Sequence, residues 1–401
     1  MSNEPPRGAA VIGQAGGPTA VINQSLVGVV EGLRRGGLIG TILGARHGVR
    51  GMVEDDFTVL TDLSAEKLER IAATPSAALG STRDKPDEPY CARIFDTLRA
   101  RDVRYFFYIG GNDSSDTCRI VNELANSAGY ELRCFHVPKT IDNDLMENDH
   151  TPGYPSAARF VARAFIGDNL DNASLKGIKI NIVMGRHAGF LTAASALARA
   201  RDDDGPHLIY LPERDFDPEQ FVADVDRVYT DLGRCVVAVS EGIHNAAGEP
   251  ISAMMSSMNE CDAHGNVQLS GSGALGDWLA NLLRVELAPE AAAPPRVRAD
   301  TFGYLQRCFP DPSPIDQMEA RAVGHKAAEV ALLGDLDGSI AIKRLHDEPY
   351  DCRFELENLS AVAGKTRVMP EEFLNGAHDI SPAFLDYARP LVGDLPEIER
   401  L

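Results

Sequence analysis

Residues 105–113 read Tyr-Phe-Phe-Tyr-Ile-Gly-Gly-Asn-Asp. Five apolar or aromatic residues without a charge are typical of a strand that is buried on both faces. Two glycines and two polar residues then end the run, and a helical pattern begins at about Ser115. A buried strand followed by a turn and a helix indicates a parallel sheet covered by helices, which is the α/β class.

The same order of buried run, polar turn and helix recurs along the chain. Residues 9–12 lead into a glycine-rich turn, and residues 21–35 form an amphipathic pattern that stops at Gly36-Gly37. Further buried strands are expected at residues 132–137, 178–184, 207–211 and 235–239. A Pro- and Gly-containing break at residues 150–155 suggests a change of lobe. We therefore expect two Rossmann-like lobes with largely parallel sheets, whose ligands bind beyond the carboxyl ends of the strands. The last 50 or so residues show no clear sheet pattern.

The net charge of the chain indicates which binding partners are not expected. Of the 401 residues, 59 are acidic and 39 are lysine or arginine, so the formal net charge is 39 − 59 = −20. Such a field repels nucleic acid and anionic membrane surfaces, and neither is expected as a partner. If the ligands are phosphates, basic side chains must gather at one site.

Cysteine usage and the chain start favour the cytoplasm. The seven cysteines lie far apart and no pair has C-x-x-C spacing, as expected of reduced thiols. Residues 1–8 are polar and do not resemble a signal peptide, and no apolar run reaches the ~18 residues that a membrane span needs.

Two glycine turns follow predicted strands. Gly16-Gly17 would let backbone N–H groups approach an anion, although a tight turn without a ligand has the same sequence. The second turn, residues 110–114, adds Asn112 and Asp113. A carboxylate there repels phosphate unless a metal ion lies between them; the alternative is a helix cap, which these residue types also favour.

Residues 138–144 read Pro-Lys-Thr-Ile-Asp-Asn-Asp and follow another predicted strand. A carboxylate beside a cation and a hydroxyl can act as the general base for an alcohol nucleophile. The lysine can stabilise a phosphoryl oxygen as negative charge builds on it. The alternative is an Asx-rich turn with a surface lysine.

Other candidate binding residues are informative only as a group. Arginine grips phosphate with two hydrogen bonds, and four arginines occupy loop or strand-end positions: Arg83, Arg186, Arg298 and Arg307. Glu241 ends a buried strand and could bind sugar hydroxyls, or it could be a partly exposed carboxylate. Residues 271–276 match G-x-G-x-x-G without a convincing strand before them, there is no P-loop, and no histidines have metal-ligand spacing.

Taken together, these loops resemble the phosphofructokinase family over residues 9–345. Gly16-Gly17 is similar to the family's first phosphate turn, residues 80–83 to its GSxR loop, residues 138–144 to its TIDND loop and residues 184–186 to its MGR motif. Glu241, Arg298 and residues 304–307 resemble its sugar-phosphate contacts, and residues 362–367 resemble its diphosphate-using branch.

The resemblance implies a role for each matched residue. Asp142 would take the proton from the 1-hydroxyl of fructose 6-phosphate, helped by Asp144, while Thr140 contacts the phosphoryl group. The catalytic set would be Asp142, Lys139, Asp113 and Arg186, and diphosphate would bind Gly16, Gly17, Arg83 and Lys139. The sugar phosphate would contact Thr140, Ile141, Asp142, Asp144, Met184, Gly185, Arg186, Glu241, Arg298, Tyr304, Leu305, Gln306 and Arg307.

Two positions indicate the phosphoryl donor. Family members that use ATP have glycine where this chain has Asp113, and commonly glycine where it has Lys139. Asp113 would put bulk and negative charge where the α-phosphate of ATP must pass, and Lys139 would stabilise the leaving phosphate. We therefore expect a reversible, diphosphate-dependent 6-phosphofructokinase. The alternatives are an ATP-dependent kinase, a kinase that prefers sedoheptulose 7-phosphate, and an inactive regulatory subunit.

The resemblance also implies a metal, an arrangement of lobes and an assembly. Mg²⁺ is expected, with Asn112 where the family usually has a metal-binding aspartate. A neutral amide is a weaker ligand, so either its oxygen still coordinates the ion or Asp113 or Asp142 takes its place. Residues 1–150 and about 308–345 would form the phosphoryl-donor lobe. Residues 151–307 and 346–401 would form the sugar-phosphate lobe, with the active site in the cleft between the lobes. A homodimer or homotetramer is expected, in which Arg298 reaches the site of a neighbouring subunit.

Overall fold

The computed structural model describes residues 5–252, 273–287, 295–334 and 336–399. Cys261 and the first two residues of the G-x-G-x-x-G match, Gly271 and Ser272, lie outside these ranges. The chain divides into two compact units. The first comprises Met1–Ser156 and Arg307–Arg367, and the second comprises Ala157–Gln306 and Val368–Leu401.

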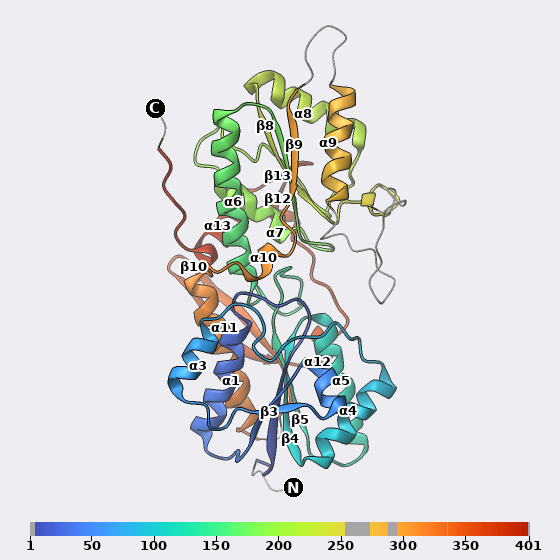
Figure 1. Cartoon of the computed structure of the whole chain (residues 1–401), viewed down its shortest axis with the longest axis vertical. Coiled ribbons are helices and arrows are strands. Elements are labelled where there is room, and N and C mark those ends of the chain that lie inside the picture. Colours follow the sequence, from blue (N-terminus) through green and yellow to red (C-terminus); the bar gives the residue numbers. More distant parts are fainter. Residues whose placement is uncertain (1–4, 253–272, 288–294, 335, 400–401) are drawn as a thin grey trace. The chain divides into compact units, whose positions relative to one another are not determined.

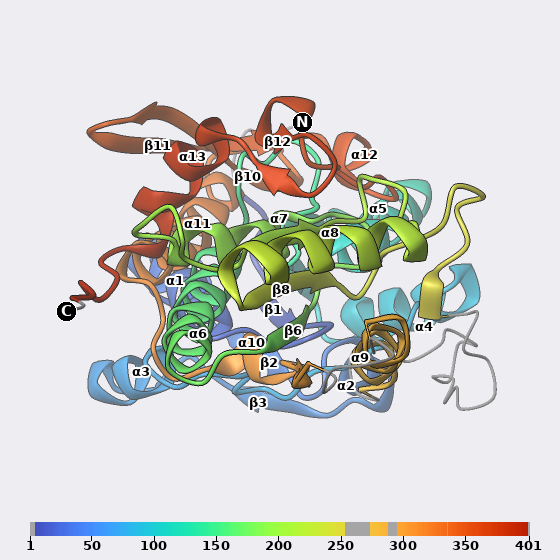
Figure 2. The same ribbon diagram turned by 90° about the horizontal axis from the view of Figure 1, so that it is seen from above.

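The first unit is built on a seven-stranded sheet with the order β11-β10-β5-β4-β1-β2-β3. The five central strands are parallel, and β11 and β3 add one antiparallel strand at each edge. The strands are β1 (Ala9–Gln14), β2 (Ile42–Ala45), β3 (Phe57–Val59), β4 (Val103–Gly110), β5 (Arg133–Pro138), β10 (Gly338–Asp347) and β11 (Tyr350–Glu357). The long β10–β11 hairpin can be followed at the edge of this sheet in Figure 2.

Helices cover both faces of this sheet because successive side chains of its strands point to opposite sides. Ala10 and Ile12 of β1 pack with α1, α3 and α11, whereas Val11 packs with α2, α4 and α5 (Figure 1). The helices are α1 (Ile22–Gly36), α2 (Val49–Glu54), α3 (Ala65–Ala72), α4 (Glu88–Ala100), α5 (Asn112–Ser127), α11 (Pro314–Ala331) and α12 (Leu359–Val362).

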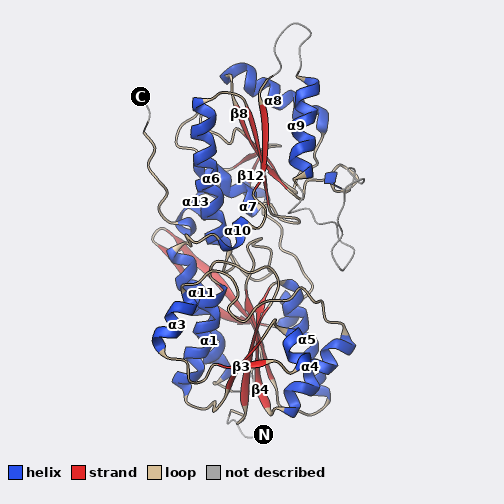
Figure 3. Cartoon of the chain, in the orientation of Figure 1, coloured by secondary structure: helices blue, strands red, loops and turns tan. Residues whose placement is uncertain are grey.

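The second unit has a four-stranded, fully parallel sheet with the order β7-β8-β6-β9. The strands are β6 (Ile178–Val183), β7 (Leu208–Tyr210), β8 (Cys235–Ser240) and β9 (Val297–Thr301). Helices α8 and α9 share one apolar core with this sheet, and α6 lies on its other side (Figure 3). The remaining elements are α6 (Tyr154–Ser174), α7 (Phe190–Ala193), η1 (Ala194–Ala198), α8 (Pro218–Leu232), α9 (Ala274–Glu286), α10 (Leu305–Cys308), η3 (Glu371–Phe373), β12 (Leu374–Asn375), β13 (Asp379–Ile380) and α13 (Pro382–Val392).

The α/β class and the buried parallel strands predicted from the sequence are confirmed. Two details differ. Helix α5 begins at Asn112 rather than near Ser115, because the amides of Ser114 and Ser115 already donate to the carbonyl of Gly111. The expectation that the last 50 residues lack sheet structure was wrong, since β11 extends into them and β12 pairs with β13.

The β10–β11 hairpin also places residues 346–367 with the first unit, whereas the sequence interpretation put them with the second. Alternate side chains of β11, including Cys352, Phe354 and Leu356, pack against the core beneath α1 and α11. The six described cysteines are free thiols, four of them buried. Within the described residues, every helix is too short or too polar to traverse a bilayer.

Candidate active site

In the first unit, the glycine turn after β1 lies close to two cationic side chains. Gly16 has a φ of 71°, a left-handed conformation that glycine adopts without steric cost. The Lys139 Nζ donates to the Gly17 carbonyl at 2.9 Å. A Cβ atom on Gly17 would lie 2.8 Å from the Nε of Arg307. Both glycines therefore let the chain approach these two cations closely.

We expect Gly17→Ala to push the Arg307 guanidinium away from the turn and to raise the KM for diphosphate roughly tenfold, since a charge-assisted hydrogen bond contributes about 1.5–3 kcal/mol. Steady-state kinetics checks this. Gly40→Ala is the control, because a Cβ there meets no atom within 4 Å. An unchanged KM in Gly17→Ala would show that the close contact has no part in donor binding.

Lys139 is a buried cation among other charges. Its side chain is only 4% exposed. Burial and the nearby Arg307 lower the pKa of Lys139 to about 8, while the carboxylates of Asp142 and Asp144 oppose that shift. Arg83 is exposed but still acts on Lys139 in the same direction as Arg307. The net charge of −20 led us to expect that basic side chains gather at one site if the ligands are phosphates. Three cations lie around this turn, as that expectation requires.

The loop after β5 presents two carboxylates. The Asp142 amide donates to the Thr140 Oγ1 at 3.1 Å, and the Thr140 hydroxyl also bonds the Asp144 side chain. Burial and the neighbouring Asp142 raise the pKa of Asp144 above its usual range. Asn143 between them has a φ of 59°, a left-handed conformation that asparagine adopts more readily than most residues. Ile141 is buried and anchors this loop.

Asn112 lies beside the same loop at the start of α5. Its Nδ2 lies 3.4 Å from the Asp144 Oδ2, and its Oδ1 is buried without a hydrogen-bond partner. An amide oxygen and a carboxylate are hard oxygen donors of the kind that Mg²⁺ prefers. Among the described residues, no cluster of three or more His, Cys, Asp or Glu could enclose a metal ion. These residues fit Mg²⁺ only as a partial shell that substrate phosphates complete.

Asp113 occupies the first turn of α5 with an exposed carboxylate. The Lys85 Nζ lies 3.5 Å from its Oδ2. The sequence analysis overlooked Lys85, although its position two residues after Arg83 in the GSxR-like loop could have suggested it. Both side chains of this ion pair are exposed, so it constrains the Asp113 carboxylate only weakly.

A buried histidine supports the turn between β4 and α5. The Nε2 of His136 donates to the Gly110 carbonyl at 2.8 Å, and its Nδ1 accepts from the Ser339 hydroxyl at 2.8 Å. Burial lowers the pKa of His136 to about 4, so the ring is neutral at pH 7. The Lys139 amide donates to the same Gly110 carbonyl, which links this histidine to the site.

Because the folded pKa of His136 lies below the unfolded value of about 6.5, its neutral form contributes stability that is complete above about pH 6.5. That contribution should be lost as the pH falls toward 4, by up to about 3 kcal/mol. Urea unfolding of the wild type and of His136→Gln between pH 7 and 4 tests this. The variant should show a shallower acid slope, and equal slopes would contradict the assignment.

The second unit gathers its candidate residues at the carboxyl ends of β6 and β8. The Met184 amide donates to the Gln306 Oε1 at 3.2 Å, and the Ser240 hydroxyl donates to the Gly185 carbonyl at 2.6 Å. Gly185 has a φ of 134°, so a side chain there would be strained. Glu241 is 5% exposed, and its amide continues the ladder by donating to the Val183 carbonyl at 2.9 Å.

The other predicted sugar contacts are more exposed. Arg186 is half-buried, and a Cβ atom on Gly242 would lie 2.2 Å from its carbonyl, so the two turns are in close contact. Tyr304 and Leu305 are 48% and 67% exposed, and Arg298 is exposed on β9. Arg307, which the resemblance groups with these residues, belongs to the first unit and lies beside Gly17.

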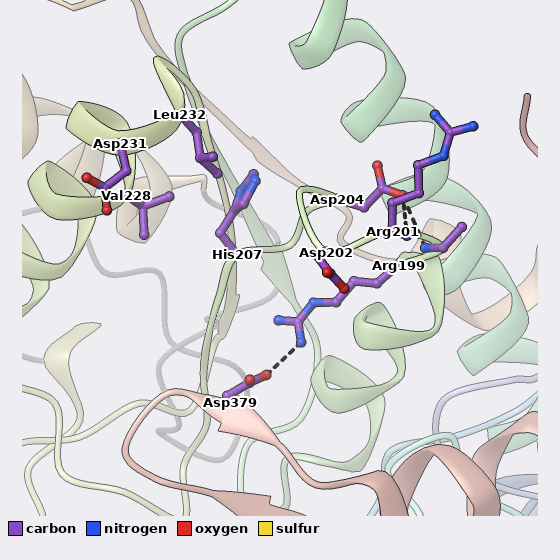
Figure 4. Close-up of a pocket in the computed structure, with 10 residues that line it drawn as sticks. Arg199, Arg201, Asp202, Asp204, His207, Val228, Asp231, Leu232 and Asp379 are labelled. Carbon is purple, nitrogen blue, oxygen red and sulfur yellow. Dashed lines mark hydrogen bonds and ion pairs between the residues drawn. The ribbon is translucent and has the colours of Figure 1, made fainter. Parts of the chain in front are cut away.

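A cavity of about 600 Å³ in the second unit contains none of the predicted site residues. Arg199 on its wall bonds the Asp379 carboxylate at 2.7 Å, as Figure 4 shows. The Asp204 carboxylate accepts from the amides of Ala200 and Arg201. These charges are already satisfied within the wall, so the cavity offers no obvious phosphate site.

Parallel strands that end in a buried lysine, arginines and paired carboxylates define an α/β phosphotransferase. The chain belongs to the phosphofructokinase family, because the family model "Phosphofructokinase" matches residues 9–331.

Individual relatives agree. The pyrophosphate–fructose 6-phosphate 1-phosphotransferase of Rhodospirillum rubrum is 56% identical, over 98% of this chain and 97% of the relative. The protein of the same name from Halomonas elongata is 38% identical, over 97% of this chain and 93% of the relative. The solved pyrophosphate-dependent phosphofructokinase from Nitrosospira multiformis is 32% identical with a TM-score of 0.84, covering 98% of this chain and 94% of that structure.

Proposed function

We propose that this chain transfers a phosphoryl group reversibly from diphosphate to the 1-hydroxyl of D-fructose 6-phosphate, giving fructose 1,6-bisphosphate and phosphate. The observation that carries the proposal is the position of Lys139, which is buried and bonded to the Gly17 carbonyl with Arg307 beside that turn. Relatives named for this reaction, including one at 56% identity, support it.

The donor is diphosphate because cations from other segments surround the turn after β1. Gly16, Gly17, Arg83 and Lys139 bind the diphosphate, and Arg307 adds a further cation next to Gly17. Asp113 carries its carboxylate in the first turn of α5, where it repels the additional phosphate of a nucleotide. Transfer between diphosphate and a sugar phosphate changes the energy of the phosphoryl group less than transfer from ATP does, so the reaction runs in both directions.

Asp142 is the general base for the sugar hydroxyl. Thr140 fixes this loop by bonding both the Asp142 amide and the Asp144 side chain. In the proposed reaction it also contacts the transferred phosphoryl group. Lys139 stabilises the charge that develops on the phosphoryl oxygens.

The second unit binds fructose 6-phosphate. Glu241 accepts hydrogen bonds from sugar hydroxyls, and Arg186 binds phosphate oxygens from the turn after β6. The Met184–Gln306 bond holds this turn against the segment that carries Tyr304 and Leu305. Arg298 joins the site from a neighbouring subunit of a homodimer or homotetramer. The phosphoryl group passes from diphosphate to fructose 6-phosphate. The diphosphate-binding residues of the first unit and the sugar-binding residues of the second therefore take part in one reaction.

Mg²⁺ is the proposed cofactor. It would be held by the unpartnered Oδ1 of Asn112 and the carboxylate of Asp144, with phosphate oxygens completing its coordination. When bound, it neutralises part of the charge on the phosphates. The free thiols among the described cysteines agree with a cytoplasmic enzyme.

The direct test is to follow both directions with the purified chain. We expect fructose 1,6-bisphosphate from fructose 6-phosphate and diphosphate, and diphosphate from fructose 1,6-bisphosphate and phosphate. Sedoheptulose 7-phosphate serves as the competing acceptor. A higher kcat/KM for sedoheptulose 7-phosphate would overturn the acceptor, and no turnover in either direction would favour a regulatory subunit.

A further inference from the structure

Helix α11 carries two buried carboxylates that the proposed reaction does not use. Asp316 is fully buried and Glu319 is 3% exposed. They are three residues apart, so both lie on one face of the helix. Burying two carboxylates is costly unless hydrogen bonds satisfy them, so their partners indicate what they do.

Both carboxylates bind the segment that follows the catalytic loop. Asp316 accepts from the amides of Gly153 and Ser156 at 2.8 and 3.0 Å. Glu319 lies 2.6 Å from the Nε2 of His150. Burial raises the pKa of Asp316 to about 6, although the hydrogen bonds from Ser156 and Gly153 oppose that shift.

A second set of contacts holds Glu319 from the opposite side. The Tyr350 hydroxyl and the Cys352 thiol of β11 both donate to its Oε1, the thiol at 3.2 Å. The Ser313 amide, just before α11, donates to the Ser156 hydroxyl at 3.1 Å. Three residues of the segment 150–156, namely His150, Gly153 and Ser156, are thus bonded to α11 or to the turn before it.

Residues 151–153 of this segment also contact the backbone of Thr140. The Thr140 amide donates to the Pro152 carbonyl at 3.2 Å, and the Thr151 hydroxyl donates to the Thr140 carbonyl at 2.9 Å. Thr140 and Gly153 also form an isolated β-bridge. The bonds that hold residues 150–153 therefore support the backbone of Thr140, whose hydroxyl bonds the Asp142 amide and the Asp144 side chain.

We propose that Asp316 and Glu319 are positioning residues for phosphoryl transfer, acting through residues 150–153 on the backbone of Thr140. Charged acceptors suit this task because their hydrogen bonds to N–H groups are shorter and stronger than neutral ones. A displacement of about 1 Å far from the chemistry can lower a rate by roughly 10²-fold, so a rigid support of this kind affects turnover.

The experiment compares Asp316→Ala and Asp316→Asn with Glu329→Gln, a control that changes an exposed acid of the same helix. Hydrogen exchange of a peptide spanning residues 138–144 is measured by mass spectrometry without substrates. We expect roughly tenfold faster exchange in Asp316→Ala, an intermediate rate in Asp316→Asn and no change in Glu329→Gln.

Kinetics supplies the second readout and rests on the proposed function. The kcat should fall by ~10–10²-fold in Asp316→Ala and less in Asp316→Asn, with both KM values within about threefold of the wild type. Unchanged exchange in a folded variant overturns the proposal, and so does a loss confined to KM. If Asp316→Ala does not fold, Asp316→Asn decides. If the wild type has no diphosphate activity, the proposed function fails while the exchange result still decides this inference.

Discussion

Replacing Asp142 by serine should lower kcat by roughly 10²–10⁴-fold, the range expected for the loss of a general base. Asp142 is half-buried, and its backbone is fixed because its amide donates to the Thr140 hydroxyl. Because the base acts only in the chemical step, the KM values for both substrates should change little. Initial rates with saturating diphosphate and fructose 6-phosphate measure the effect.

Asp142→Asn is the matched comparison for this prediction. Asparagine keeps the size and the backbone position of the residue but cannot accept the proton, so it should be as inactive as serine. A kcat within about tenfold of the wild type in either variant would assign the base to another group.

Asp113→Gly, alone or with Lys139→Gly, should admit ATP as a donor and weaken the use of diphosphate. Removing the Asp113 carboxylate frees space and removes a repulsive charge at the start of α5, and it releases Lys85 to bind a phosphate oxygen. We expect the kcat/KM for ATP to rise at least ~10-fold, which corresponds to about 1.4 kcal/mol. Parallel assays with the two donors measure the change.

Asp116→Gly controls for the helix destabilisation that any glycine brings, about 1 kcal/mol, because Asp116 lies one turn further along α5 and pairs with Arg119. If ATP use rises equally in both variants, the effect is not specific to position 113. If neither Asp113→Gly nor the double variant gains ATP activity, the steric and electrostatic argument about the donor fails.

The sequence was informative where the determining interactions are local. Three strands of each sheet were predicted from short buried runs, namely β1, β4 and β5 in the first and β6, β7 and β8 in the second, and the glycine turns from the backbone freedom that such strand ends require. The same features placed Gly16, Gly17, Asn112 and residues 139–144 at the carboxyl ends of β1, β4 and β5.

Contacts between residues that are far apart in the chain could not be predicted from the sequence. Lysine is usually exposed, so the near-complete burial of Lys139 could not be read from its neighbours in the chain. Arg307 meets Gly17 across about three-quarters of the chain length, and Asp316 meets Gly153 from a separate segment. Strand β11 was overlooked because its alternate residues are charged and solvent-facing, although Cys352, Phe354 and Leu356 form an apolar stripe.

The central claim is that Lys139 and Asp113 make this phosphofructokinase diphosphate-dependent. The measurement that tests it most directly is the kcat/KM of the wild-type chain for diphosphate and for ATP, each with fructose 6-phosphate and Mg²⁺ at one pH. We predict that diphosphate supports efficient turnover and that ATP supports little or none. A higher kcat/KM for ATP than for diphosphate would contradict the claim.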